Sequence, residues 1–256
     1  MHGRRMALLI GLLIGMGSLP GELPGPAAAE ELPFLLEGDL GLAIGVPQGD
    51  LADEIEDPGA GGQLVFGIGS RSMPIFVGAN LGWMSYGSDS REERFSPDIP
   101  EVQVEVKTSN NILYGHLLLR MQPPSGRFRP YLDGLVGFKN FYTKTEIRNI
   151  DGNDEEPIAE SKNLDDTALS YGIGGGLRYR IYTAETAGST AEGDQDSTQK
   201  SPLRISLHAG AWYLLGGEAD YLKEGSIRQE EGRVLYDISQ SNTDLLIIHL
   251  GVSLSY

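Results

Sequence analysis

The most regular feature of the chain is an alternation of apolar and polar residues with a period of two. It is clearest near the C-terminus, where one face carries Leu246, Ile248, Leu250, Val252, Leu254 and Tyr256. The residues between them, such as His249, Gly251 and Ser253, are mostly small or polar. Successive side chains of a β-strand point to opposite faces, so this pattern predicts a strand with one apolar and one polar face.

Eight segments carry the pattern: residues 36–46, 63–69, 75–86, 113–121, 131–142, 169–182, 203–213 and 246–256. Their connections alternate between short (70–74 and 122–127) and long and polar (47–62, 87–108, 145–166 and 216–243). Residues 183–202 break this order, and we interpret them as a polar insertion on the short-turn rim. Short turns on one rim and long loops on the other are typical of bacterial outer-membrane barrels. The sequence therefore predicts an all-β fold, an eight-stranded antiparallel up-and-down transmembrane β-barrel.

A soluble β-barrel or β-sandwich would also alternate, and the direction of the charged face distinguishes the two classes. A soluble barrel turns its apolar face inward and its charges to water. Here the polar faces hold few charges, and charge concentrates in the long connections. This distribution favours apolar faces turned to lipid, with an aromatic set on or near the lipid side: Trp83, Phe138, Tyr171, Tyr179, Tyr213 and Tyr256. A soluble periplasmic binding barrel is the alternative.

Composition narrows the functional classes. The 256 residues include 35 Gly and no Cys, and the formal net charge is −16. Without cysteine there are no disulfides, no thiolate nucleophiles and no Cys-ligated metal centres. The acidic balance argues against nucleic acid as a partner, because clustered Lys and Arg side chains bind its phosphates.

The N-terminus has the order of a secretory signal peptide. Arg4 and Arg5 precede the apolar run 6–16, and Ala27-Ala28-Ala29 offers a small-residue cleavage site. The apolar run is too short for a membrane-spanning helix, which needs about 20 residues. We therefore predict a signal peptide at residues 1–29 and an exported barrel domain at 30–256, placed in the outer membrane of a Gram-negative-type bacterium.

Together, the signal peptide, the eight alternating strands and an aromatic final residue resemble the small outer-membrane β-barrel proteins. These include the opacity-type and porin-like barrels and the transmembrane domain of outer membrane protein A. The most specific match is the C-terminal pattern Ile248, Leu250, Val252, Leu254 and Tyr256. The resemblance implies that this pattern is read by the barrel-assembly machinery, although Phe is commoner than Tyr as the last residue. The resemblance covers essentially the whole mature chain, and it indicates the architecture of the protein rather than its chemistry.

Charged residues on the predicted inward faces suggest an internal ion-pair network, because a buried charge without a partner is very costly. Three acids and five bases belong to this set: Glu37, Asp39, Asp133, Arg120, Lys139, Arg178, Arg180 and Arg204. An eight-stranded barrel is just wide enough for side chains to fill it. A filled interior is therefore favoured over an open pore.

No residue pattern predicts catalysis or a metal site. Ser206 with His208, and His249 with Ser253, are the nucleophile–base combinations, but their face points into the barrel, away from a lipid substrate. The acidic segment 151–156 lacks the glycine and final glutamate of a calcium-binding EF-hand loop, and a second acidic group at 50–57 is interpreted as solvated surface. We therefore expect no cofactor and no bound metal.

The predicted function is structural or interactive at the cell surface, through long acidic loops that face outside, without catalysis. The partners expected are outer-membrane lipid, the barrel-assembly machinery and an extracellular ligand that the sequence does not identify, and the barrel is expected to be a monomer. The alternative function is a narrow pore or a channel for a small hydrophobic ligand.

Overall fold

The structure is a computed structural model that describes residues 34–96, 99–149, 158–184, 203–223, 225–230 and 233–256. The predicted signal peptide, the acidic segment 151–156 and almost all of the predicted insertion at 183–202 lie outside these residues. In the part of the chain that is described, no helix is long and apolar enough to cross a membrane.

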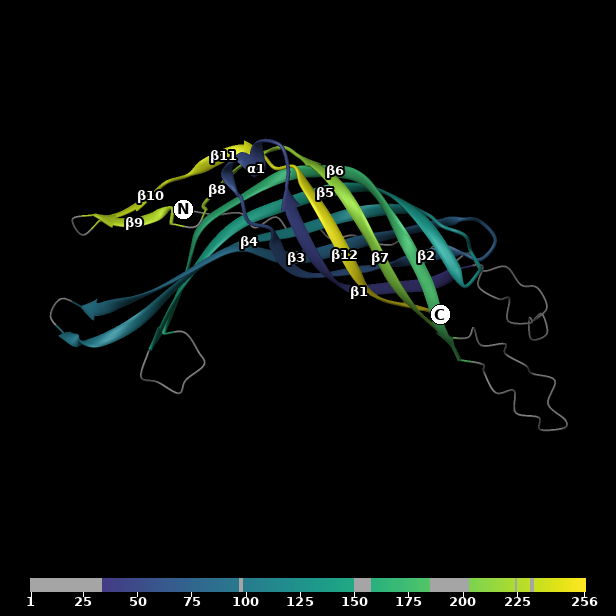
Figure 1. Ribbon diagram of the computed structural model, residues 1–256, viewed down its shortest axis with the longest axis horizontal. Coiled ribbons are helices and arrows are strands. Elements are labelled where there is room, and N and C mark those ends of the chain that lie inside the picture. Colours follow the sequence, from purple (N-terminus) through teal and green to yellow (C-terminus); the bar gives the residue numbers. More distant parts are fainter. Residues whose placement is uncertain (1–33, 97–98, 150–157, 185–202, 224, 231–232) are drawn as a thin grey trace, which may run out of the picture. The chain divides into compact units, whose positions relative to one another are not determined.

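Eight antiparallel strands form a closed, hydrogen-bonded ring in which each strand pairs with its neighbours in the chain (Figure 1). The ring strands are β1 (Phe34–Pro47), β2 (Gly59–Ser70), β3 (Ile75–Ser96), β4 (Ile99–Met121), β5 (Phe128–Asn149), β6 (Ala159–Thr183), β7 (Arg204–Gly216) and β12 (Leu245–Ser255). The prediction of an eight-stranded antiparallel barrel is confirmed, and all eight predicted segments lie within these strands or extend past them by a single residue.

Pairing of the first strand with the last closes the ring. β1 and β12 pair from Glu37 opposite Ser255 to Pro47 opposite Leu245. Beyond this register, the backbones of Leu36 and Tyr256 exchange two hydrogen bonds, of 3.0 and 2.9 Å. No ring strand is left with a free edge along this seam, which removes the unpaired backbone groups that an open sheet would expose.

Two segments predicted as long loops are largely strand. β3 and β4 stay paired as far as Ser96 and Ile99, and β5 and β6 stay paired as far as Ile147 and Ala159. The prediction failed because the outward residues change from apolar to charged, and because a bulge shifts the register at Ser85/Gly87 and again at Thr143/Lys144. Backbone pairing continues where the alternating hydrophobic signal ends. We call residues 86–96, 99–110, 143–149 and 159–169 the extension sheet.

The other two long connections also hold regular structure that the sequence analysis missed. Between β1 and β2 lies the short helix α1 (Asp50–Glu54). Between β7 and β12 lie β8 (Glu218–Tyr221), β9 (Ile227–Glu230), β10 (Arg233–Tyr236) and β11 (Ser239–Asn242). β8 pairs with β11 and β9 pairs with β10, so this connection folds back on itself as two small ribbons.

The apolar faces of the ring strands point outward and the polar faces point inward. Leu40 on β1 is 69% exposed and Ile173 on β6 is 72% exposed, whereas Arg120 on β4 is 1% exposed. The predicted aromatic set Trp83, Phe138, Tyr171, Tyr179, Tyr213 and Tyr256 is exposed throughout. This orientation is the reverse of that in a soluble barrel, whose apolar side chains fill the interior.

Glycine lines the interior wherever two strands approach most closely. Gly41 on β1 lies opposite Gly251 on β12, and Gly176 on β6 lies opposite Gly210 on β7. A Cβ atom at Gly251 would lie 2.1 Å from the carbonyl oxygen of Leu40, far inside van der Waals contact. Because glycine has no side chain, these pairs leave room for the large inward side chains nearby.

We predict that Gly251→Ala lowers the thermal unfolding midpoint of the detergent-folded protein. The added methyl group has no space, so a loss of about 1–3 kcal/mol is expected for such overpacking. The matched control is Gly38→Ala on β1, where the nearest atom to an added Cβ is the Val65 carbonyl oxygen at 3.8 Å. Equal midpoints for the two variants would contradict the close approach at the seam.

Candidate functional site: the filled interior of the barrel

A buried ionic network crosses the interior near the short-turn end of the ring. Arg120 on β4 and Asp133 on β5 are cross-strand partners. The Arg120 guanidinium donates from Nε to Asp133 Oδ1 at 2.7 Å and from Nη2 to Oδ2 at 2.9 Å. Its Nη1 donates to Asp39 Oδ2 on β1 at 3.0 Å. Such two-pronged contacts match the guanidinium fork to the carboxylate and are among the stronger hydrogen bonds in proteins.

The network continues to a second arginine. Arg178 on β6 donates from Nη2 to both oxygens of Asp39, at 2.6 and 2.8 Å, and from Nη1 to Glu37. Arg129 on β5 donates to Glu37 at 3.3 Å, and the side-chain amide of Gln122 donates to the same carboxylate at 2.9 Å. Three carboxylates therefore meet three guanidiniums, and these six charges balance.

Three residues of this network were not singled out from the sequence: Gln122, Arg129 and Trp212. The indole Nε1 of Trp212 on β7 donates to Asp133 Oδ2 at 2.8 Å. Arg129 lies an even number of residues before Asp133 on β5, so the alternation of the sequence places both side chains on the same inward face. The signal was missed because the strand was taken to begin after Pro130.

The other three predicted network residues form no ion pair with these acids in the described part of the chain. Lys139 on β5 is fully buried, and its Nζ donates to the backbone carbonyl oxygen of Thr243 instead of to a carboxylate. Arg180 and Arg204 are partly buried at the short-turn end. Within the residues that the structure describes, neither of these two arginines forms an ion pair. The sequence grouped all eight charges because they share a face, although they lie at different heights in the barrel.

The interior histidines each have a distinct environment. His116 Nε2 lies 2.9 Å from Ser170 Oγ, and His116 Nδ1 lies 3.4 Å from Asn80 Oδ1. This Ser–His–Asn arrangement resembles a nucleophile with its base and orienting group. All three side chains are sealed from solvent, Ser170 and Asn80 at 0% exposure, so no substrate reaches the hydroxyl. The contact is polar filling of the barrel.

The combinations weighed from the sequence are not assembled as nucleophile–base pairs. His208 Nδ1 contacts Ser253 Oγ at 3.1 Å rather than Ser206. His249 has its ring 4.4 Å from that of Trp212, and both of its ring nitrogens lack a hydrogen-bond partner in the described residues. Among these residues, no group of three His, Asp or Glu side chains is placed to hold a metal ion.

An apolar plug fills the loop end of the ring. Leu51 on α1 is buried in a cluster with Met84, Phe141, Tyr221 and Ile247. The ring centroids of Phe141 and Tyr221 are 5.5 Å apart. The long connections therefore pack into the loop end of the barrel and bury their own apolar residues there.

Polar contacts fasten the plug at its outer side. Lys223 Nζ donates to Glu54 Oε2 at 2.8 Å, and Ser239 Oγ donates to the same oxygen at 2.9 Å. These hydrogen bonds hold the pKa of the exposed Glu54 carboxyl below its usual value, Lys223 contributing most. These two hydrogen bonds, which we call the clasp, join α1 to the connection that contains β8 and β11.

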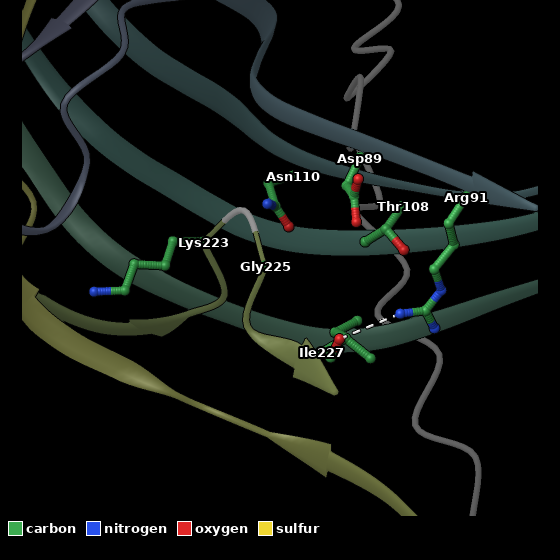
Figure 2. A pocket seen from close by; sticks show the side chains of 7 residues that line it. All are labelled: Asp89, Arg91, Thr108, Asn110, Lys223, Gly225 and Ile227. Carbon is green, nitrogen blue, oxygen red and sulfur yellow. Dashed lines mark hydrogen bonds between the residues drawn. The ribbon is translucent and has the colours of Figure 1, made fainter. Parts of the chain in front are cut away.

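A small cavity lies where the extension sheet meets this connection (Figure 2). Its lining residues are Asp89, Arg91, Thr108, Asn110, Lys223, Gly225 and Ile227. Arg91 Nη1 donates to the Ile227 carbonyl oxygen at 3.5 Å and thereby bridges the two parts. The volume of about 10 Å³ is that of a single water site. The cavity is therefore a small packing gap between the extension sheet and this connection, and it is too small for a ligand.

Aromatic side chains bound the outward apolar band at both ends. At the loop end, Trp83 Nε1 donates to the Tyr142 hydroxyl at 2.8 Å, and Lys162 Nζ lies 5.1 Å from the Tyr142 ring centroid. At the short-turn end, the Arg127 guanidinium lies 5.0 Å from the Tyr179 ring centroid. Aromatic rings with a polar or cationic neighbour suit a boundary between an apolar and an aqueous phase.

Comparison with solved structures finds similarity to several proteins, three of which have TM-scores of 0.32–0.33. Neisserial surface protein A is 11% identical, with a TM-score of 0.33 over 88% of this chain and 96% of that chain. The N-terminal β-barrel domain of Pseudomonas aeruginosa OprF is 12% identical, with a TM-score of 0.32 over 88% and 98%. A major outer membrane protein from Thermus thermophilus is 13% identical, with a TM-score of 0.33 over 86% and 99%. No protein-family model and no curated protein matches the chain.

We predict that Asp133→Ala strongly destabilises the folded barrel. The variant leaves Nε and Nη2 of Arg120 and the Trp212 indole N–H without their acceptors, and breaking a buried pair typically costs about 3–5 kcal/mol. Asp53→Ala on the exposed side of α1 is the matched control. Adding Arg120→Met to the Asp133 variant should recover part of the loss, because it removes the uncompensated charge. Equal unfolding midpoints for Asp133→Ala and Asp53→Ala would contradict the network.

The clasp on α1 gives a prediction of pH dependence. Because the folded pKa of Glu54 is lowered, its contribution is present at neutral pH and is lost as the pH falls through the acid range, below about 4.3 for a free Glu. Lys223→Met should therefore increase amide hydrogen exchange in α1 at pH 7. Lowering the pH from 7 to 4 should then reduce the protection of α1 less in this variant than in the wild-type protein. Protection in the ring strands is the internal control and should not change. Unchanged exchange in α1 at pH 7 would exclude a role for the clasp.

Proposed function

We propose that this protein is an integral outer-membrane β-barrel that acts as a structural or cell-surface interaction protein and has no catalytic activity. The single observation that carries this proposal is the inverted polarity of the ring. A closed barrel with exposed Leu, Ile, Val and aromatic faces needs apolar surroundings, and a membrane supplies them. A soluble periplasmic barrel would expose these faces to water, which disfavours that alternative.

The proposal includes the route to the membrane. The predicted signal peptide at residues 1–29 would direct export, and the C-terminal pattern would be read by the barrel-assembly machinery. The five residues of that pattern, Ile248, Leu250, Val252, Leu254 and Tyr256, are all exposed on the outer face of the ring. Their exposure supports this role, since a recognition signal has to be accessible. We expect the barrel to act as a monomer in contact with outer-membrane lipid.

The filled interior supports a structural role over transport. Trp212, Lys139, Arg120 and Arg178 are fully buried large side chains that occupy the ring. The apolar plug on α1 and β8 adds a second obstruction at the loop end. The loops and the extension sheet would then present the surface for interaction, and the ligand they recognise is not specified by the structure.

Gel migration of the detergent-extracted protein, boiled and unboiled, tests membrane insertion. We expect a heat-dependent change in apparent mass and retention in the membrane fraction after osmotic shock, because a hydrogen-bonded ring resists detergent at room temperature. Release by osmotic shock without a heat-dependent shift would overturn the proposal and favour the soluble barrel.

Conductance in planar bilayers then separates the structural role from the pore. We expect no steady conductance above the bare bilayer at neutral pH. Steady conductance of the wild-type protein would favour the pore.

A further inference from the structure

Among the described residues at the short-turn end of the barrel, arginines outnumber acids. We call Gln122, Arg129, Arg178, Arg180 and Arg204, together with Glu37, the arginine mouth. These residues come from β1, β5, β6 and β7 and from the turn after β4, and they lie within a few residues of the strand ends at that rim. The whole chain is acidic, so this concentration of arginine is local.

Glu37 is shared among several hydrogen-bond donors. Its carboxylate accepts hydrogen bonds from Arg129, Arg178 and Gln122. Arg129 and Arg178 are directly opposite each other across β5 and β6, where like charges repel, and Glu37 bridges them. The single negative charge of Glu37 therefore already faces two guanidiniums.

In the described part of the chain, Arg180 and Arg204 form no ion pair with an acid, although Glu37 attracts Arg204 electrostatically. Arg180 and Arg71 lie close enough to Arg204 to repel it, and Arg204 in turn repels Arg129. Three side-chain atoms at this end are buried and lack a hydrogen-bond partner: the Nε atoms of Arg178 and Arg204 and the Oε1 atom of Gln122. Partly buried guanidiniums that face one another are unfavourable unless an anion lies between them.

We propose that the arginine mouth binds an anion of the phosphate class through Arg180 and Arg204. A guanidinium presents several N–H donors in a planar fork that matches phosphate oxygens, and two such forks from adjacent strands can hold one phosphoryl group. An anion there would relieve the repulsion between Arg180 and Arg204, which are neighbours because β6 and β7 pair in this region, with Arg180 opposite Ser206.

Two sources present this chemistry at a barrel rim: the headgroup of an anionic phospholipid in the adjoining leaflet, and a soluble phosphate. The lipid source rests on the membrane placement proposed above, whereas the soluble source does not. Arg127 beside Tyr179 marks the same rim as a boundary between apolar and aqueous surroundings, which is the depth at which lipid headgroups lie.

The test uses the full folded protein in neutral detergent. Native mass spectrometry and titration calorimetry measure binding of phosphatidylglycerol, of phosphatidylcholine as the neutral lipid, and of pyrophosphate at constant ionic strength. The test variant is Arg180→Gln with Arg204→Gln. The control is Lys144→Gln with Arg148→Gln, which removes the same charge from the extension sheet, where both bases already pair with Glu146.

We expect the test variant to bind phosphatidylglycerol or pyrophosphate at least about tenfold more weakly, since two charge-assisted contacts are removed. The control variant should stay within about twofold of wild type, and Arg204→Lys should lose less than Arg204→Gln. Preference for phosphatidylglycerol over pyrophosphate identifies the lipid source, and the reverse identifies the soluble one.

Equal affinity of wild type and test variant, or an equal loss in the control, would overturn the site. The boiled and unboiled gel shift is measured for every variant, so failure of the barrel to form is distinguished from failure to bind. If the double variant does not fold, the single Arg180→Gln and Arg204→Gln variants, each expected to bind several-fold more weakly, decide the question.

Discussion

The contact on which the rest of the structure depends is the buried pairing of Arg120 with Asp133 and Asp39. Closing eight strands into a narrow ring with apolar faces outward turns the polar faces of these strands inward, except in the extension sheet. Each inward charge then has to be satisfied by another. Arg120 connects β4, β5 and β1 in this way, and Arg178 adds β6. The pairing ties together strands that are not neighbours in the ring, which backbone hydrogen bonds alone cannot do.

From this constraint the two ends of the barrel acquire different characters. The short-turn end is ionic, because Glu37, Asp39 and Asp133 collect the arginines there. The loop end is apolar, because Leu51 and Tyr221 bring their side chains into the ring from outside it. Between the two ends, the interior holds paired glycines, histidines and Trp212. This space is too narrow for a large inward side chain on every strand. An interior built in these layers stiffens the ring and obstructs passage, which fits an anchor for surface loops better than a conduit.

Much of the fold could be predicted from the sequence, since strand parity alone determines which side chains share a face. The partners on the inner face could not, because ring closure brings Arg178 and Asp39 together from 139 positions apart. Parity also says nothing about height along the barrel axis, which is why Lys139 was grouped with acids that lie elsewhere. The extension sheet was missed because its outward residues are charged: Lys144 pairs with Glu146 and Glu160 at 2.8 and 2.9 Å, and no apolar alternation marks such strands.

Aromatic side chains end the outward apolar band at both rims of the barrel. At the loop rim the Trp83–Tyr142 pair is followed at once by the charged pairs of the extension sheet, and Lys162 lies against the Tyr142 ring. At the other rim Arg127 lies against Tyr179. The same arrangement, a cation beside an aromatic ring, therefore ends the apolar band on both sides. Such rings suit a boundary between apolar and aqueous surroundings, because an apolar ring is combined with a polar or charged neighbour. The outer pairs bound the apolar band, whereas the Arg120 network joins strands across the interior.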